Sequence, residues 1–392
     1  MTSIVQEIEE INDFEALPGY REVWNRLLTQ TPEAHFFQSW DWLTTYWAYF
    51  QADQKLRVFL HLEAGEPIGF VPLVVRPEKT RVGRIRVLTY PLDEWGSLYG
   101  PIGPEPAKTL QAALEHLRHS RRDWDLLELR WVGPEDEAEG RTRQALEAVG
   151  FRPIRTVWNQ TAVVELADGQ AGWERYLARR SAKWRANLRT AEKKLAALGP
   201  VEYIRYRPLG EPAGQTDPRW DLYEACYQIA QRSWQGGSET GTTLCHPQVR
   251  DFLRQVHASA ARLGAVDMNL LYVGGRPAAF AYNYVWQGRV YGLRCGFDPQ
   301  AAHDGAGNVL LAWAIRDSFF RNDHLYDLGV GYLETKRTWM TCLRPIYRYS
   351  CFPSRRLRML PIRWKRQWQA WTEIADSTKT SEPPSGGGAG AF

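Results

Sequence analysis

An acidic residue at the end of a short apolar segment is the first candidate for chemistry. Asp327 lies near the end of segment 324–328 and is followed by Gly329 and Gly331, a pattern typical of a strand that ends in a turn. A carboxylate whose pKa is raised by burial can accept a proton, directly or through water. The alternative is that Asp327 only caps the glycine turn.

Two further residues after this turn are candidates for ligand binding. Lys336 can bind an anionic group, and Trp339 can form the wall of an acceptor pocket, although a core or surface position would suit each of them as well.

A glycine-containing loop lies between an expected strand at 289–297 and an expected helix at 309–320. Glycines let backbone N–H groups approach phosphate oxygens closely, and the N-terminus of a helix favours anions. We expect Asn308 to cap the helix and the loop to bind phosphate, unless it is an ordinary strand-to-helix turn. The predicted phosphate-binding residues are His303, Gly305, Ala306, Gly307 and Asn308.

The equivalent loop of the first half, at 100–106, cannot serve in the same way. It contains three prolines, which lack an N–H donor, and a glutamate, which repels an anion. Any phosphate-bearing ligand is therefore expected to bind the second half.

A basic stretch precedes these motifs. Segment 173–198 has the apolar periodicity of one long helix, and eight basic residues lie between positions 173 and 194 against only Glu174 and Glu192. A polar face of this helix is expected to bind an anionic substrate or simply to be solvated. The residues assigned to substrate binding here are Arg180, Lys183, Arg185 and Asn187.

Trp234 lies in a polar loop between helices expected at 219–233 and 247–263. A large aromatic residue in such a loop either fills a gap in the core or stacks on a ligand, and we assign Trp234 and Trp339 to substrate binding. No metal site is expected, because His116 and His119 have no further ligand cluster around them. The five cysteines contain no Cys-x-x-Cys pair, which argues against zinc and disulfides.

Composition restricts the class of protein. The chain has 392 residues, 44% of them hydrophobic, and a formal net charge of +4, too small for a general nucleic-acid binder. The acidic N-terminus does not resemble a signal peptide, and no apolar run is long enough to span a bilayer. We therefore expect a cytoplasmic protein that does not bind DNA.

The two halves of the chain resemble each other. The segment Gly65-Glu66-Pro67-Ile68-Gly69-Phe70 matches Gly275-Arg276-Pro277-Ala278-Ala279-Phe280, each at the turn of an expected hairpin, and a helix followed by a buried strand recurs downstream of both. The pattern predicts an α/β (α+β) fold that is a tandem duplication, each unit a mixed sheet flanked by helices. The expected domains are 1–160 and 161–372, followed by a disordered tail at 373–392.

This order of elements resembles the GNAT acyltransferase unit, and two units in tandem resemble the FemABX layout. The chain looks most like the CelD/BcsL-type branch of GNAT proteins. The motifs that carry this resemblance are Phe37-Gln38-Ser39-Trp40, the helix 180–189, Ser233-Trp234-Gln235-Gly236, Gly241-Thr242-Thr243-Leu244, and Tyr326-Asp327-Leu328-Gly329 with Lys336 and Trp339.

The resemblance implies a transferase that moves an acyl group from acyl-CoA, such as acetyl-CoA, to a sugar, amine or hydroxyl acceptor. It also implies a setting in cellulose, exopolysaccharide or cell-envelope synthesis. The alternatives are a FemABX-like transferase that uses aminoacyl-tRNA and a catalytically degenerate scaffold or regulatory subunit. The last remains open because relatives usually carry an acidic residue and a tyrosine where this chain has Leu333 and Thr335, with Glu334 and Tyr332 as possible substitutes. The candidate catalytic set that the resemblance implies is therefore Asp327, Tyr332, Glu334 and Lys336.

The C-terminal region is basic and rich in tryptophan. Between positions 348 and 372 there are seven basic residues and no acidic one, and Trp364, Trp368 and Trp371 have helical spacing. The stripe predicts either an amphipathic helix at a membrane surface or a helix that packs its tryptophans on the domain. The first alternative would suit a protein peripheral to the inner face of a membrane, beside a polysaccharide synthase.

Overall fold

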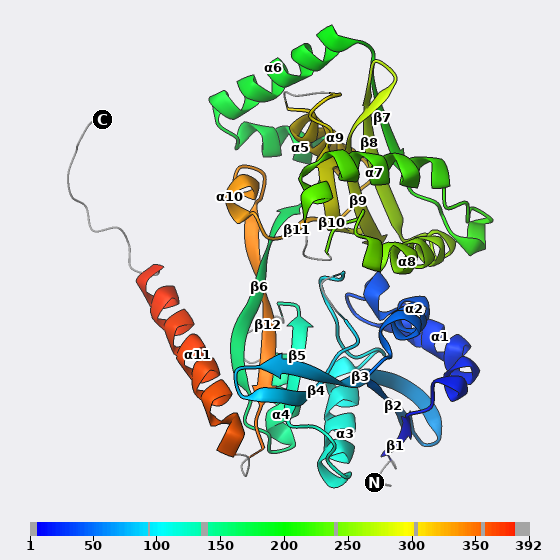
Figure 1. Cartoon of the computed structure of the whole chain (residues 1–392), viewed down its shortest axis with the longest axis vertical. Helices are drawn as coiled ribbons and strands as arrows, with labels where there is room; N and C mark the ends of the chain where they lie inside the picture. Colours follow the sequence, from blue (N-terminus) through cyan, green and yellow to red (C-terminus); the bar gives the residue numbers. More distant parts are fainter. Residues whose placement is uncertain are drawn as a thin grey trace.

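Two α/β halves share one sheet in the computed structural model, which describes residues 6–92, 95–134, 140–238, 242–301, 305–353 and 357–380. The first half is blue to cyan and lies below the second half, green to yellow, in Figure 1. The sheet has twelve strands, in the order β1-β2-β3-β4-β5-β12-β6-β11-β10-β9-β8-β7. The fold prediction, a mixed sheet flanked by helices, is confirmed.

The first repeat begins with four antiparallel strands, β1 (Gln6–Ile11), β2 (Lys55–Glu63), β3 (Glu66–Thr80) and β4 (Gly83–Thr89). Helix α3 (Pro106–His119) then leads to β5 (Leu126–Val132), which is parallel to β4. Every residue of β5 is buried, as expected for a strand covered on both faces.

The second repeat has the same order. Strands β7 (Val201–Tyr206), β8 (Val266–Val273), β9 (Arg276–Trp286) and β10 (Arg289–Phe297) are antiparallel, and α9 (Ala306–Phe320) leads to β11 (Leu325–Val330), parallel to β10. Gly65 and Gly275 both adopt positive φ in the equivalent two-residue hairpin turns, which explains the matching glycines. This recurrence confirms the tandem duplication.

The last strand of each repeat pairs with the other repeat. Strand β6 (Ile154–Glu165) pairs with β11, β12 (Cys342–Cys351) pairs with β5, and β6 and β12 pair with each other, all antiparallel. The strand order is therefore symmetric about the β6–β12 contact, which runs between the two halves in Figure 1. The expected domain boundary between residues 160 and 161 falls within β6.

Helices cover the faces of the sheet and also join the halves. Helix α2 (Trp40–Phe50) packs against α8 (Arg250–Arg262), where Trp42 meets Phe252 with ring centroids 5.8 Å apart, and nearby Phe36 meets Tyr284 at 4.6 Å. The remaining α-helices of the described residues are α1 (Arg21–Gln30), α4 (Arg141–Ala148), α5 (Gly169–Ala178), α6 (Ala182–Leu198), α7 (Trp220–Arg232), α10 (Leu333–Lys336) and α11 (Leu360–Thr380). Short 3-10 turns include η2 (Phe36–Gln38) and η4 (Trp234–Gly237).

Two local expectations need correction, the helix at 173–198 and the disordered tail at 373–392. The expected single helix at 173–198 is two helices, because Ser181 caps α6 by accepting from the Trp184 backbone N–H, and the Arg185 guanidinium donates to the Leu177 carbonyl at the end of α5. Strands β1, β4 and β7 were not expected. Of the expected tail, 381–392 lies outside the described residues, while α11 continues to Thr380.

A buried carboxylate links β12 to the first repeat. We call β6 and β12 the exchanged strands, because each pairs with a strand of the other repeat. Glu128 on β5 is fully buried and accepts hydrogen bonds from Ser350 of β12 at 2.6 Å, Arg130 at 2.7 Å and Arg366 of α11 at 3.2 Å. Burial alone would raise the pKa of Glu128, but the arginines, Arg130 first, lower it to about 2. The network therefore holds β5, β12 and α11 together.

We predict that Glu128→Gln lowers the free energy of unfolding by about 3–5 kcal/mol at pH 7, because it removes a fully buried negative charge that Arg130 and Arg366 share. Arg130 keeps a second carboxylate partner, Glu78, at 2.7 Å, whereas Arg366 has no other ion pair with a described residue. The folded-state pKa of about 2 lies below the ordinary 4.5, so the carboxylate stabilises the fold above pH 4.5 and loses this effect as pH falls toward 2. Urea unfolding at several pH values measures the difference. If the difference in the free energy of unfolding between variant and wild type did not become smaller at acidic pH, this account would be contradicted.

Candidate functional site

A cavity of about 610 Å³ lies where the two repeats meet. Its lining comes from loops of the first repeat around residues 31–38 and 98–107, and from β6, β10, β11 and β12. Its size falls in the range of pockets that hold small-molecule ligands. Because both repeats and both exchanged strands contribute, neither repeat alone could form it.

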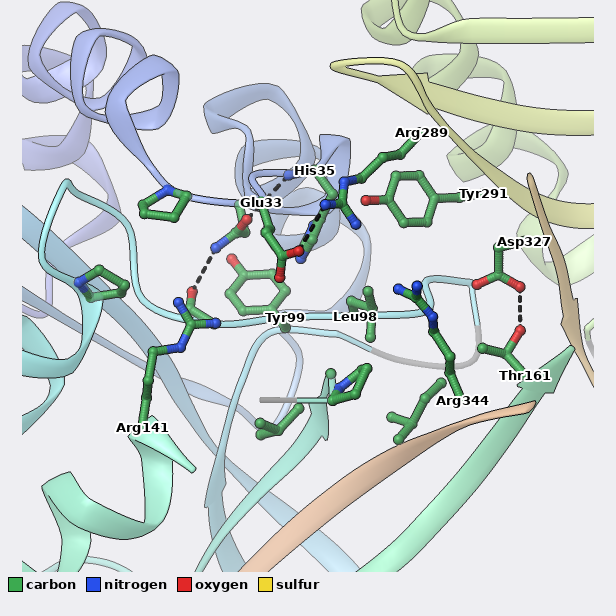
Figure 2. A pocket seen from close by; sticks show the side chains of 18 of the residues that line it. Glu33, His35, Leu98, Tyr99, Arg141, Thr161, Arg289, Tyr291, Asp327 and Arg344 are labelled. Atoms are coloured by element: carbon green, nitrogen blue, oxygen red, sulfur yellow. Dashed lines mark hydrogen bonds and ion pairs between the residues drawn. The ribbon is translucent and has the colours of Figure 1, made fainter. Parts of the chain in front are cut away.

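Three arginines enter this cavity from different sides (Figure 2): Arg141, Arg289 and Arg344. Arg289 is paired with Glu33 at 2.7 Å and Arg344 with Glu165 at 3.0 Å. Arg141 forms no ion pair with any residue that the structure describes. Guanidinium groups bind carboxylate and phosphate through paired N–H donors, so the cavity suits an anionic ligand.

Two buried polar atoms in the cavity wall have no hydrogen-bond partner among the described residues: His35 Nδ1 and the Tyr99 hydroxyl. Burial lowers the pKa of His35 to about 3, so its ring is neutral at physiological pH. The Gln38 side chain fixes this wall by donating to the carbonyls of Gly100 at 3.2 Å and Pro101 at 3.0 Å. Unpaired buried polar groups are costly, and a ligand in the cavity could satisfy both.

Asp327 lies at the edge of the same cavity, on β11 (Figure 2). Its side chain is almost completely buried and accepts hydrogen bonds from the Thr161 hydroxyl of β6 and from the Gly329 N–H at 2.7 Å. Burial raises the pKa of Asp327, and the hydrogen bond from Thr161 opposes this rise only in part. The carboxylate is therefore a stronger base than an exposed aspartate.

Strands β10 and β11 separate beside Asp327 and form a fork. They pair only from Arg289 to Tyr291, opposite 325–327, and β10 then bulges near Gly292. A Cβ on Gly292 would lie 2.6 Å from the Asp327 carbonyl oxygen, so glycine permits this close approach. In α/β sheets, ligands often bind in the crevice where neighbouring strands separate.

The Lys336 side chain lies at the same fork. Its ammonium donates to the carbonyls of Gly329 at 2.8 Å and Val330 at 3.0 Å, and burial lowers its pKa. The structure therefore brings Lys336 to the same fork as Asp327, two residues that the sequence assigned to catalysis. Their catalytic roles remain predictions.

Two exposed aromatic rings meet across the outside of the fork. Trp234 belongs to η4, which is held on β10 because the Gln235 amide donates to the Cys295 carbonyl at 3.1 Å. Tyr332 begins α10 just after β11, and its ring contacts Trp234 edge-on at 5.8 Å. Trp234 is 52% exposed and Tyr332 71%, so both faces remain open to a ligand.

The N-terminus of α9 lies beyond the far end of β10. Gly305 caps it in the left-handed conformation, with φ of 85°, so Asn308 lies inside the first turn and is not the cap that we expected. The cap shifts because glycine adopts this conformation without strain. The amides of Ala306, Gly307 and Asn308 are in the first turn, where N–H groups lack helical partners. His303 lies outside the described residues.

Helix α6 packs directly over this N-terminus. A Cβ on Gly305 would lie 2.7 Å from the Ala191 Cβ. Asn187 and Lys194 share the Ala191 face of α6 because they lie one turn before and one turn after it. The basic helix therefore places an amide and an ammonium near the start of α9, which adds to its attraction for phosphate.

Other predicted residues lie away from the cavity. Arg180 donates to the Thr338 and Met340 carbonyls at 3.0 and 3.1 Å, Arg185 caps α5, and Trp339 is buried edge-on against Trp184 at 4.8 Å. Arg180, Arg185 and Trp339 thus contact other parts of the protein, and none of them lines the cavity. Glu334 is exposed and paired with Arg337 at 3.4 Å, and Lys183 is exposed on α6.

Apart from Asp327, the polar residues of the cavity were not found from the sequence. His35, Tyr99, Arg141, Arg289 and Arg344 come from five separate segments, and no local spacing links them. One signal was available, the proline- and glycine-rich loop at 100–106, which we had interpreted as unsuited to phosphate and therefore as part of a structural or acceptor-binding half. A loop that is rigid and poor in donors is also well suited to line a preformed pocket.

Comparisons with known proteins agree with this geometry in the second repeat. Residues 182–337 match the family described as Acetyltransferase (GNAT) domain, which supports a transferase that takes a small-molecule acyl donor. The matched segment includes the fork and the N-terminus of α9. No curated protein matches the chain.

Among solved structures, FemX is similar to the chain with a TM-score of 0.59 and 11% identity, covering 90% of this chain and 99% of FemX. This likeness shows a shared fold. A conserved protein of unknown function from Bacteroides thetaiotaomicron matches with a TM-score of 0.48 and 12% identity, over 88% of this chain and 100% of that one. A tandem GNAT protein from the clavulanic acid biosynthesis pathway matches at 0.40 and 11%, over 89% and 100%.

We predict that Asp327→Asn does not destabilise the protein and raises its thermal midpoint, increasingly so from pH 4 to pH 8. A carboxylate whose folded pKa is raised destabilises the folded state as pH rises through the ordinary pKa toward the folded one, because its charge is buried. Asparagine keeps an oxygen that can accept from Thr161 and Gly329. Thermal unfolding at several pH values tests this, and a lower midpoint for the variant at pH 8 would show that the charge stabilises the fold.

Proposed function

We propose that the protein is an acyltransferase that moves an acyl group from acyl-CoA, such as acetyl-CoA, to an amine or hydroxyl of an anionic acceptor. One observation carries this proposal: the β10–β11 fork, which holds Asp327 and Lys336, adjoins the arginine-lined cavity at Asp327. A donor and an acceptor could thus reach the same carboxylate from two sides. The GNAT match over residues 182–337 supports the acyl-CoA donor.

The donor would bind along β10 in the second repeat. Its pyrophosphate would meet the first-turn amides of α9, with Asn187 and Lys194 nearby, and its pantetheine arm would run to the fork. Trp234 and Tyr332 would cover this arm, because their rings meet across the outside of the fork. This assigns Trp234 to the donor, where stacking on a ligand explains its exposure.

The chemistry requires a base and a stabiliser of negative charge. The acceptor nitrogen or oxygen attacks the thioester carbonyl, its proton passes to Asp327 directly or through water, and the carbonyl oxygen becomes an oxyanion. Lys336 would stabilise that oxyanion with the N–H that it does not donate to Gly329 or Val330. The oxyanion then re-forms the carbonyl as the carbon–sulfur bond breaks, and the leaving thiolate takes up the proton held by Asp327, directly or through water, which restores the carboxylate.

The acceptor would occupy the cavity between the repeats. We propose a phosphorylated or carboxylated sugar or a cell-envelope precursor, because three arginines face the cavity and His35 and Tyr99 offer unpaired polar atoms. Cellulose or exopolysaccharide synthesis, at the cytoplasmic side of a membrane, is the setting that we propose from the resemblance of the sequence to CelD/BcsL-type proteins.

We predict that acetyl-CoA and free CoA bind the purified protein, and that Gly307→Glu weakens binding about tenfold relative to Gly307→Gln. The two substitutions have the same size, and the glutamate adds a negative charge where the phosphates would lie. A Cβ at Gly307 meets only Phe297, at an ordinary 3.7 Å, so both variants should fold. Isothermal titration calorimetry gives the dissociation constants.

Each result of this titration bears on the proposal. Equal binding by the two Gly307 variants would place the donor elsewhere than at α9. If neither ligand binds at millimolar concentration, the acyl-CoA donor is wrong, and binding of aminoacyl-tRNA with a steep salt dependence would identify the FemABX-like alternative. A protein that binds neither donor would be a scaffold.

We predict that Arg344→Gln raises the KM for an anionic acceptor roughly tenfold or more, because it removes a charge-assisted hydrogen bond. Glucosamine phosphate and unphosphorylated glucosamine are the paired probes, with acetyl-CoA as donor and release of CoA as the readout. The matched control is Arg337→Gln, an exposed arginine that directly follows α10 and does not line the cavity. Equal effects of Arg344→Gln on both probes would show that the cavity does not select for charge.

A further inference from the structure

Helix α11 is attached to the protein through a mainly polar face, with Ile362 packed on a small apolar cluster at the start of the helix. Arg366 donates to Glu128 at 3.2 Å, the Gln369 side chain accepts from Arg348 at 2.9 Å, and the Glu373 carboxylate accepts from the Val157 N–H at 2.9 and 3.0 Å. These residues are spaced as one side of a helix. Figure 1 shows α11 in red along the outside of β6 and β12.

The aromatic face of α11 points away from the protein. Trp364 is 65% exposed, Trp368 64% and Trp371 68%, and none has a ring contact with the residues that the structure describes. A surface helix normally buries its apolar stripe and exposes its polar side. The orientation here is reversed, so the alternative in which these tryptophans pack on the domain is wrong.

The charges around this stripe are of one sign. Arg363 and Lys365 flank Trp364 on its two sides, and neither forms an ion pair with a described residue. Between residues 357 and 373 the single acidic residue is Glu373, which turns inward to β6. The outer face is therefore aromatic and cationic. It is complementary to a surface that has negatively charged groups on the outside and an apolar layer below them.

We propose that the outer face of α11, defined as Trp364, Trp368 and Trp371 with Arg363 and Lys365, docks on an anionic lipid bilayer. Tryptophan prefers the depth of the lipid headgroups, and flanking cations pair with anionic lipids. The helix would lie in the plane of the surface, and no described helix is long and apolar enough to cross a membrane. This inference concerns where the protein works and holds whether or not it transfers acyl groups.

A second copy of the chain fits this face less well. An isologous contact would bring the same stripe and the same two cations together, and residues 357–373 offer no outward acidic side chain to pair with them. A bilayer with anionic lipids supplies the missing negative charge. Charge complementarity therefore favours the lipid surface.

The test is sedimentation of the full-length protein with vesicles of phosphatidylcholine alone and of phosphatidylcholine with phosphatidylglycerol. We expect binding to the mixed vesicles, weaker binding to the neutral ones, and a loss of about tenfold or more in the partition coefficient for Trp364→Ser/Trp368→Ser/Trp371→Ser. The matched control is Leu198→Ser/Leu209→Ser/Phe320→Ser, which removes exposed apolar side chains elsewhere. It should bind as the wild type does.

Two further measurements make the outcome decisive. The triple tryptophan variant should keep the thermal midpoint of the wild type, because the substituted rings are exposed; a large fall would assign them a structural role and overturn the proposal. Light scattering without vesicles should show no self-association that depends on the tryptophans. A dimer that the wild type forms and the tryptophan variant does not form would identify this face as an interface between copies and overturn the proposal. Failure of the wild type to bind either kind of vesicle would also overturn it.

Discussion

The pairing of β6 with β11 and of β12 with β5 is the constraint on which the rest of this structure depends. Each repeat ends in a strand that the other repeat needs in order to extend its sheet beyond the parallel pair. The two repeats therefore form one continuous sheet, and the loops at the junction are held at fixed positions. The cavity exists because of this exchange, since its walls include both exchanged strands and loops of the first repeat.

The exchange also places two carboxylates in corresponding surroundings with opposite consequences. Glu128 on β5 and Asp327 on β11 lie in equivalent strands, and each accepts a hydrogen bond from a hydroxyl of an exchanged strand, Ser350 or Thr161. Arginines surround Glu128 and lower its pKa to about 2, whereas burial dominates at Asp327 and raises its pKa. One position thus stabilises the junction, and the other keeps a basic carboxylate beside a cavity.

The sequence allowed the repeated architecture to be predicted because that information is local. The hairpin turns need glycine at positive φ, and buried strands and amphipathic helices have distinct periods. The cavity could not be predicted, because Arg141, Arg289 and Arg344 are brought together only by the sheet. The sequence also could not show whether the tryptophan stripe of α11 faces the protein or the solvent. Periodicity shows which residues share one face of a helix, but not what that face contacts. The break between α5 and α6 depends on side-chain caps at Ser181 and Arg185, which interrupt an otherwise continuous apolar pattern.

The repeats have diverged where a ligand would be bound. Helix α3 of the first repeat begins at Pro106, and Glu105 precedes it, so the start of this helix has one donor fewer and a nearby negative charge. The equivalent helix α9 begins after Gly305, with first-turn amides that lack partners within the helix, and the Asn187–Lys194 face of α6 packs over it. If both repeats had kept such a helix start, the molecule would have two equivalent donor sites and no distinct place for an acceptor. The loss of donors in the first repeat instead leaves its rigid loop, pinned by Gln38, to form a wall of the cavity. A duplication that is symmetric in its sheet is thus asymmetric at its helix starts, which is what the proposed reaction between an acyl donor and a different acceptor would require.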